Sequence, residues 1–342
     1  MQLLNTLYVL TPDAWLRLDN DTIRVEVERE VKLRVPLHHL SGVVCMGNVG
    51  LSTPLIHRLA EDGLTLVLLD GGGRFKARVE GALSGNVLLR VAQHEKAREV
   101  SFAIEASRAC VAGKLRNCRQ VLLRGARESK CEEDAGAIRG AADSLAASLR
   151  SLERAADLDA IRGVEGEAAR RYFAALNAII RPEGREHFRM DGRTRRPPRD
   201  RFNAVLSFLY AMLTTDCRSA SEAAGLDPQV GFLHALRPGR PALALDLMEE
   251  LRPLVDRIVI TLVNRQQLAP TDFDMREGGG VMLRDEARRR VVAAYQERKQ
   301  EEVSHPLFSE SIPIGLLPLV QARLMARAIR GEAEGYLPFI MR

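Results

Sequence analysis

The sequence predicts an α+β fold, in which a small β-rich domain over residues 1–90 precedes a larger all-α domain over residues 91–342. Two patterns predict this division. Before about residue 90, apolar and charged residues alternate, as in Thr22–Arg29, and this alternation is typical of half-buried strands. From about Val91 the apolar residues follow the longer period of amphipathic helices. The length of 342 residues also favours two domains.

The β-rich domain is expected to hold short strands separated by turns and one helix. The helix begins after Ser52, a suitable N-cap, has Pro54 in its first turn, and ends at Gly63. The glycines of Asp70–Gly73 lie between two strands and not before a helix, so a hairpin turn is favoured over a phosphate-binding loop. The strands are expected, in chain order, over residues 22–29, 32–35, 42–47, 64–69 and 74–80.

The all-α domain opens with long helical segments over residues 91–126 and 137–180. Its last helix is expected over residues 316–329, where the apolar residues fall on one face and the basic residues on the other. Such a helix can lie on a membrane surface, but packing against the helical core is the better interpretation. The basic residues that then face outward are Arg323, Arg327 and Arg330.

Residues 184–201 form a charged connection that contains proline and many arginines. A solvated loop and a contact with the DNA backbone are equally good interpretations of it. Asp200 is a suitable N-cap for the apolar helix that follows. On that helix Asn203, Ser207 and Tyr210 share one stripe, and a polar stripe on an apolar helix requires buried partners or a binding site.

Composition restricts the class of protein. Hydrophobic residues make up 46% and charged residues 28% of the chain, as in ordinary globular proteins. Aromatic residues are only 5%, which disfavours a stacking platform for single-stranded nucleic acid. The net charge of +5 is compatible with a phosphate-rich partner, although a GC-rich genome explains the excess of arginine over lysine equally well.

The cysteines and the N-terminus indicate the compartment. Five cysteines without a CxxC pair disfavour a zinc ribbon or a disulfide framework, and they are natural in a reducing environment. The N-terminus lacks the basic segment and long apolar core of a signal peptide. No run of about 18 apolar residues predicts a transmembrane helix. We therefore expect a cytoplasmic protein without membrane association.

The stretch Gly225–Pro253 concentrates residues that bind cations. It holds His234, then a basic breaker over Arg237–Pro241, then a helix that carries Asp246 and Glu249, with Glu250 after them. An imidazole and one or two carboxylates together can form a site for a hard cation. The alternative is a packed histidine followed by a plain amphipathic helix with an acidic face toward solvent.

A second acidic segment lies over Ile161–Phe173. Glu165 stands between Gly163 and Gly166, and such small neighbours let a ligand approach the backbone closely. The alternative is a glutamate near a helix N-terminus that interacts with the helix dipole.

Three ordered motifs resemble those of a known family. They are GVEGEAARRYF, then RRPPRDRFNAVLSFLYAML, then GLDPQVGFLH followed by RPALALDLMEELRP. This series is similar to the CRISPR-associated adaptation integrases. The segment GNVGLSTPLIHRLAEDGLTLVLLDGGGRFKARVEG resembles the β-domain of the same family, and the resemblance extends over essentially the whole chain.

The resemblance implies a metal site and a reaction. The ligands it implies are Glu165, His234 and Glu249, with Asp246 as the alternative third ligand in the same helix. Two carboxylates and one imidazole suit Mg²⁺ or Mn²⁺, which lowers the pKa of a hydroxyl and neutralises charge on phosphate oxygens. In the family, the 3′-hydroxyl of a foreign DNA fragment attacks a phosphodiester of the CRISPR repeat, and water in its place gives endonuclease activity.

The resemblance also implies partners: double-stranded DNA, a second copy of the chain joined through the β-domains, and a second small CRISPR adaptation subunit. The residues proposed to contact DNA are Arg195, Arg196, Arg237 and Arg240, for which solvated loop charges are the alternative. Two other functions are weighed against the integrase. One is a repair nuclease for branched DNA, and the other is an arginine-rich scaffold that binds DNA without cutting it.

Overall fold

The computed structural model describes residues 6–73, 75–79, 81, 87–308 and 311–341. The chain folds into two compact units, Met1–Ser84 and Gly85–Arg342. Strands dominate the first unit and helices the second, so the predicted α+β class is confirmed. Helix α2 (Val87–Arg98) begins a turn before the change of period that the sequence shows at Val91.

The first unit holds two four-stranded sheets. One has the order β1-β5-β7-β8, in which β1 (Thr6–Val9), β5 (Gly42–Met46) and β7 (Thr65–Leu69) are parallel and β8 (Phe75–Val79) is antiparallel. The other has the order β4-β3-β2-β6. Its strands are β4 (Glu30–Pro36), β3 (Thr22–Val27), β2 (Trp15–Asp19) and β6 (Gly50–Leu51).

Helix α1 (Thr53–Glu61) packs against β2 and β7. It starts after Ser52 with Pro54 in its first turn, and Gly63 follows its end at a φ of +66°, a value that glycine adopts without strain. Ser52 occupies the predicted N-cap, but its hydroxyl caps no backbone N–H, so that part of the prediction is wrong. The run after Asp70 is a hairpin turn between β7 and β8, as predicted.

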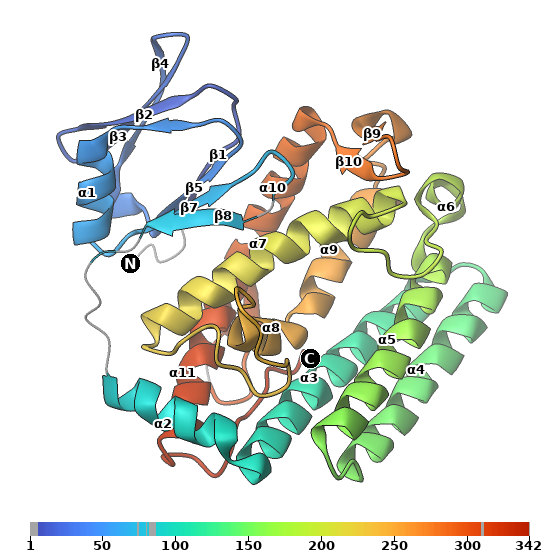
Figure 1. Cartoon of the computed structure of the whole chain (residues 1–342). Coiled ribbons are helices and arrows are strands. Elements are labelled where there is room, and N and C mark those ends of the chain that lie inside the picture. Colours follow the sequence, from blue (N-terminus) through green and yellow to red (C-terminus); the bar gives the residue numbers. More distant parts are fainter. Residues whose placement is uncertain (1–5, 74, 80, 82–86, 309–310, 342) are drawn as a thin grey trace. The chain divides into compact units, whose positions relative to one another are not determined.

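Helices build most of the second unit (Figure 1), and ten of them lie within the described residues. They are α2, α3 (Val100–Glu128), α4 (Glu132–Glu153), α5 (Leu158–Ile179), α6 (Pro182–Phe188), α7 (Arg201–Ala223), α8 (Ala242–Glu249), α9 (Arg252–Asn264), α10 (Asp285–Gln300) and α11 (Leu317–Ile329). Short 3-10 turns lie at Leu37–His39 in the first unit and at Pro270–Asp272 and Ile314–Leu316 in the second.

The second unit is not all-α, contrary to the prediction. It contains one antiparallel ribbon of β9 (Phe273–Met275) and β10 (Val281–Leu283) and another of β11 (Glu302–Ser304) and β12 (Ser311–Pro313). Strands of three residues are too short to show an alternating pattern, so no periodicity predicted them.

The predicted connection over residues 184–201 is partly helical, since α6 occupies Pro182–Phe188. Pro182 and Glu183 in the first turn favour helix formation there. Asp200 caps α7 as predicted, because its carboxylate accepts a hydrogen bond from the backbone N–H of Asn203 at 2.7 Å.

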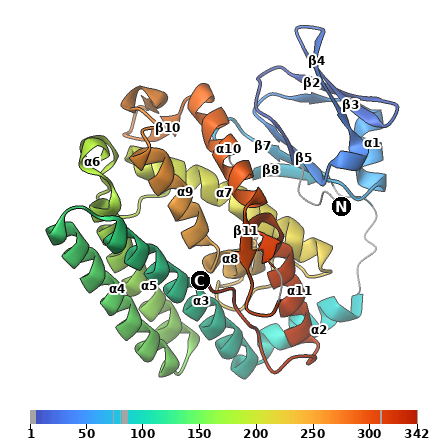
Figure 2. The same cartoon turned by 180° about the vertical axis from the view of Figure 1, so that it is seen from behind.

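Helices α3, α4 and α5 pack against one another in all three pairs and lie together in both views (Figures 1 and 2). Helix α7 is buried along most of its length and packs against α8, α9 and α11. In α11 the apolar face is buried and the predicted basic residues are exposed, as expected. No helix within the described ranges is both long and apolar enough to cross a bilayer.

Candidate functional site

The residues predicted to bind metal come from three segments that the fold of the second unit brings together. Helix α5 supplies Glu165, helix α8 supplies Asp246 and Glu249, and the irregular segment before α8 supplies His234. Helix α3 packs against both α5 and α8. Residues distant in the sequence therefore meet in one place.

The segment before α8 passes very close to that helix. A Cβ on Gly231 would lie 2.6 Å from the Asp246 carboxylate and 2.6 Å from the backbone of Ala242. Cβ atoms in proteins do not approach other heavy atoms so closely. Glycine at this position allows the backbone to reach the carboxylate. The close approach fixes His234, three residues further on.

Asp246 holds this segment in place. Its side chain is fully buried. Oδ2 accepts hydrogen bonds from the backbone N–H of Phe232 at 2.6 Å and of Leu233 at 3.0 Å. Oδ1 accepts one from the backbone N–H of His234 at 3.0 Å and lies 2.7 Å from its Nδ1. Four interactions thus occupy the two oxygens of this carboxylate, and they direct the imidazole toward Glu249.

Glu165 and Glu249 converge on a lysine that the sequence interpretation did not identify. Lys114 of α3 forms an ion pair with Glu165 Oε1, and its Nζ lies 2.6 Å from Glu249 Oε2. Arg252 Nε donates to Glu249 Oε1 at 2.9 Å, and His234 Nε2 lies 3.8 Å from the same oxygen. The cluster therefore contains two carboxylates, one imidazole and two fixed cations.

The charges in this cluster support each other. Burial tends to raise the pKa of Glu249, but Arg252, Lys114 and His234 outweigh it and hold that pKa well below its ordinary value. Burial likewise tends to lower the pKa of Lys114, but Glu249 and Glu165 raise it above its ordinary value. Both side chains are therefore charged at neutral pH.

Both oxygens of Glu249 have a cationic partner. Oε1 accepts a hydrogen bond from Arg252, and the buried Oε2 forms an ion pair with the Lys114 ammonium at 2.6 Å. Among residues 6–73, 75–79, 81, 87–308 and 311–341, no three His, Cys, Asp or Glu side chains form a ready-made metal cluster. The position between the two glutamates is that of the Lys114 ammonium.

Two of the alternative interpretations are wrong, namely the acidic face of α8 toward solvent and the helix-dipole role of Glu165. Asp246, Glu249 and Glu250 are at most 4% exposed, so α8 has no acidic face toward solvent. Helix α5 begins at Leu158, so Glu165 lies about two turns inside it and not near its N-terminus. Its partner is Lys114, and not the helix dipole.

A second network lies behind the cluster. Tyr172 and Tyr210 donate to the buried Asp256 carboxylate at 2.8 and 2.6 Å, and burial raises the pKa of Asp256 to about 6. The Arg252 guanidinium lies 4.7 Å from the centre of the Tyr210 ring, as in a cation–π contact. The ring and the carboxylate of Glu249 thereby fix Arg252 from two sides.

The predicted polar stripe of α7 has the buried partners it requires. Arg193, from the connection before α7, donates to Asn203 Oδ1 at 2.8 Å and to Ser207 Oγ at 3.1 Å. Tyr210 continues the stripe to Asp256. The sequence predicted the need for partners, but it did not identify Arg193.

The arginines predicted to contact DNA are surface residues. Arg195, Arg196 and Arg237 are exposed, and Arg240 is half-buried. Partial burial lowers the pKa of Arg240, and the charges of Arg237, Arg162 and Arg195 lower it further. These arginines therefore lie near one another. Because Arg162 also donates to the carbonyl of Leu233 at 2.8 Å, the positive patch lies beside His234.

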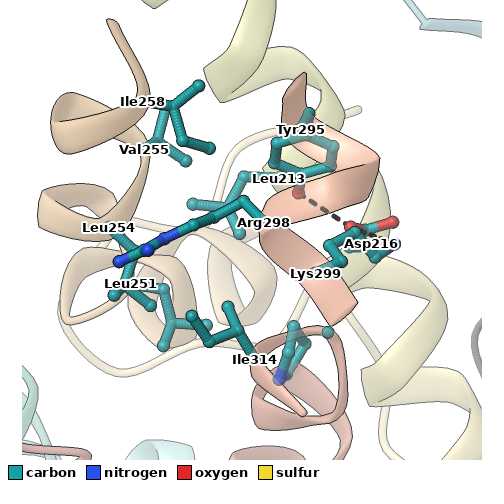
Figure 3. Close-up of a pocket in the computed structure, with 12 residues that line it drawn as sticks. Leu213, Asp216, Leu251, Leu254, Val255, Ile258, Tyr295, Arg298, Lys299 and Ile314 are labelled. Atoms are coloured by element: carbon teal, nitrogen blue, oxygen red, sulfur yellow. Dashed lines mark hydrogen bonds and ion pairs between the residues drawn. The ribbon is translucent and has the colours of Figure 1, made fainter. Parts of the chain in front are cut away.

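A small cavity lies elsewhere in the second unit, between α7, α9 and α10 (Figure 3). Its volume of about 30 Å³ is enough for a water molecule. At its wall Asp216 accepts hydrogen bonds from Tyr295 at 2.8 Å and Lys299 at 2.9 Å. This ion pair belongs to the core and contains none of the predicted site residues.

An α+β fold holds a buried carboxylate–imidazole cluster beside surface arginines, which is the arrangement expected of a metal-dependent nuclease. The family model described as "CRISPR associated protein Cas1" matches residues 7–297. The chain belongs to this family, and the predicted resemblance is confirmed.

Two relatives are similar over nearly their full length. A CRISPR-associated endonuclease Cas1 of Moorella thermoacetica is 55% identical over 341 residues, 99% of each chain. One of Rhodospirillum rubrum is 50% identical over 347 residues, covering 100% of this chain and 99% of the relative. Their names confirm the predicted class of enzyme, an endonuclease of the CRISPR system.

Solved structures share the fold. A Cas1 protein from Thermotoga maritima matches with a TM-score of 0.83 at 23% identity, over 97% of this chain and 99% of the other. A chain of a Cas6-RT-Cas1–Cas2 complex matches with a TM-score of 0.83 at 25% identity, over 99% of this chain and 36% of the other.

Proposed function

We propose that this nuclease is a metal-dependent DNA integrase of CRISPR adaptation. It joins the 3′-hydroxyl ends of foreign DNA fragments to the CRISPR repeat by transesterification, and it cleaves DNA when water replaces the hydroxyl. The observation that carries the proposal is the convergence of Glu165 and Glu249 on one cation position, with His234 Nε2 beside them.

The donor set fits Mg²⁺ or Mn²⁺. Two carboxylates and one neutral imidazole nitrogen are ligands that these ions accept, Mn²⁺ the nitrogen more readily. Asp246 beside His234 Nδ1 leaves Nε2 for a metal, an arrangement common around metal-bound histidines. A bound ion would act as a Lewis acid on the phosphate and lower the pKa of the attacking hydroxyl.

The third ligand that we propose is Glu249, with Asp246 as a positioning residue. The oxygens of Asp246 are occupied by three backbone N–H groups and the imidazole. Glu249 instead has one oxygen held by Arg252, and its other oxygen already faces a cation, the Lys114 ammonium that it shares with Glu165. The arrangement favours Glu249 as the carboxylate that reaches a cation.

The proposed partners follow from the surface charge and from the relatives. Double-stranded DNA would pair its phosphates with Arg195, Arg237 and Arg240, since guanidinium groups bind phosphate oxygens in pairs. A second small subunit is proposed because two of the similar solved chains belong to Cas6-RT-Cas1–Cas2 complexes. A homodimer joined through the first unit, DNA contact by Arg196 and a cytoplasmic location are also proposed.

The test combines the purified protein, Mn²⁺, a DNA fragment with free 3′-hydroxyl ends and a supercoiled plasmid that bears a CRISPR repeat. We expect fragment joining at the repeat. Glu165→Ala and His234→Ala should lower joining by roughly a thousandfold or more, because the metal's contribution to the barrier is several kcal/mol. DNA affinity, measured by fluorescence anisotropy, should change little.

Glu167→Ala is the matched control for Glu165→Ala. Glu167 lies on the same helix but pairs with the exposed residues Arg170 and Arg171, so its loss should leave joining unchanged. Cleavage of branched DNA without joining would instead support a repair nuclease. DNA binding with neither reaction would support a non-catalytic scaffold.

A further inference from the structure

Lys114 occupies an unusual position for a lysine. It lies in the middle of α3 on a face of small and apolar residues, and its side chain is only 8% exposed. Lysine is rarely buried without partners, because an ammonium ion loses its hydration there. The partners of Lys114 are Glu165 of α5 and Glu249 of α8, so one ammonium joins three helices.

The charges around Lys114 are balanced. Glu165 and Glu249 carry two negative charges, and Lys114 and Arg252 carry two positive charges. A divalent cation that approached the two glutamates would meet the Lys114 ammonium at the position between them. Both ions cannot occupy that position, and together they would leave an excess of positive charge in a buried cluster.

We propose that Lys114 competes with the divalent metal ion for Glu165 and Glu249, so that the metal binds in exchange for the lysine ammonium. This inference rests on the metal site proposed above and assigns Lys114 as a positioning residue. Lys114 holds the two carboxylates together until the metal replaces it. Arg252 remains on the other oxygen of Glu249, where it does not stand between the carboxylates.

The exchange has a consequence for DNA. When the metal binds, it adds positive charge to a site where the displaced Lys114 ammonium remains nearby. The phosphates of bound DNA would offset this excess charge. Metal and DNA should therefore bind with positive cooperativity, and by linkage each raises the affinity for the other by the same factor. The site should bind metal weakly in the free protein and tightly on DNA.

The first experiment measures Mn²⁺ affinity by calorimetry in the DNA-free protein. Lys114→Met removes the competing charge but keeps an unbranched side chain, and we expect it to raise the affinity roughly tenfold or more, a typical size for site coupling. Adding DNA should then raise the Mn²⁺ affinity less in the variant than in the wild type. An unchanged or weaker affinity in Lys114→Met would overturn the exchange.

Lys299→Met is the matched control. Lys299 has the same 8% side-chain exposure and pairs with one oxygen of the half-buried Asp216 carboxylate, at the cavity shown in Figure 3. In EDTA, the Lys299→Met variant should lose thermal stability, and so should Lys114→Met. The Mn²⁺ affinity of Lys299→Met, however, should equal that of the wild type. Mn²⁺ should restore the melting temperature of Lys114→Met and not of Lys299→Met.

A second experiment needs no variant. Amine acetylation followed by mass spectrometry reports how accessible each lysine is. Lys114 should be protected in EDTA and should react faster with Mn²⁺ and DNA present, while Lys299 stays protected in both conditions. Equal protection of Lys114 in both conditions would overturn the inference. If neither wild type nor variant binds Mn²⁺ with or without DNA, the metal site itself fails, which is a different result from equal affinities.

Discussion

Two neighbouring carboxylates at the end of α8 lie in opposite environments. Glu249 belongs to a cluster with charged partners, called here the cationic cluster and made of Lys114, Glu165, His234, Glu249 and Arg252. Glu250 belongs to a tail cluster, in which neutral donors surround it: Tyr336 and Gln321 donate to Oε1 at 2.6 and 2.7 Å, and the backbone N–H of Phe339 donates to Oε2 at 3.0 Å.

Both carboxylates are buried, so burial alone does not separate them. In the cationic cluster full charges lower the pKa of Glu249 far below its ordinary value. In the tail cluster burial outweighs the three hydrogen bonds and raises the pKa of Glu250 to about 8. The kind of partner therefore decides which acid is ionised and ready to bind a cation.

The tail cluster attaches the C-terminal segment to the same helix that carries Lys114. Asn117 of α3 donates to the carbonyls of Glu250 and Phe339 and accepts from the backbone N–H of Met341 at 2.7 Å. A Cβ on Gly113 would lie 2.8 Å from Pro338, so α3 and the segment are in close contact. The tail cluster thus supports the back of the proposed metal site.

The largest expected effect separates the two carboxylates by function. Glu249→Gln should lower fragment joining by roughly a thousandfold, since it removes a charged ligand of the metal. Glu250→Gln should lower it less than about tenfold, because it changes only the support behind the site. Parallel assays of joining and calorimetric Mn²⁺ titrations check this difference.

Asp246→Asn sharpens the same comparison. Loss of the Asp246 carboxylate charge should misplace the His234 imidazole and so reduce fragment joining. The Mn²⁺ affinity should fall less than in Glu249→Gln. If Asp246→Asn alone abolished Mn²⁺ binding and Glu249→Gln retained it, Asp246 would be the third ligand. Equal losses in Glu249→Gln and Glu250→Gln would mean that both clusters act only on folding.

Local patterns predicted much of this architecture. Alternating residues and short apolar runs predicted β3, β4, β5, β7 and β8 of the first unit, but not β1, β2 or β6. Asp200 and Gly63 marked helix ends, because these signals depend on neighbours in the chain. The cationic cluster was only partly predictable. Its acids and imidazole lie in recognisable motifs, but Lys114 is 51 residues from Glu165 and meets it only through the packing of α3 on α5.

A lysine within the small and apolar residues of α3 was the one local signal for the missing member of the cluster. Arg193 could not be identified for the same reason. The polar stripe on α7 predicted a buried partner, but not which residue provides it. The orientation of the Asp246 side chain could not be predicted either, since it depends on the close approach of the backbone at Gly231. Sequence periodicity predicts which face is buried, whereas contacts between faces require the tertiary fold.

A smaller effect concerns the pH dependence of stability in the tail cluster. The pKa of Glu250 rises from 4.5 to about 8 on folding, so the folded state keeps a proton that the unfolded state releases. The resulting stability is fully present below about pH 4.5 and is lost as the pH rises to about 8. Urea unfolding at pH 5, 6.5 and 8 should show a loss on the order of a few kcal/mol.

Glu250→Gln isolates this contribution. The variant has no proton to lose at this position, so its stability relative to the wild type should improve as the pH rises from 5 to 8. The pKa of Asp256, about 6, gives a slope of the same sign, but it is present in both proteins and cancels in the difference. Parallel pH curves for the two proteins would show that Glu250 does not titrate in this range.

The smallest effect lies at the surface beside the cationic cluster, where solvent screens the charges. Arg240→Gln should weaken DNA binding only a few-fold, and it should reduce the slope of log affinity against log salt by about one phosphate contact. Arg323→Gln on α11, an exposed arginine outside the patch, is the control and should leave the slope unchanged. Anisotropy titrations at several salt concentrations measure both. A slope unaltered in Arg240→Gln would show that Arg240 pairs with no phosphate and would leave Arg195 and Arg237 as the proposed contacts beside the cationic cluster.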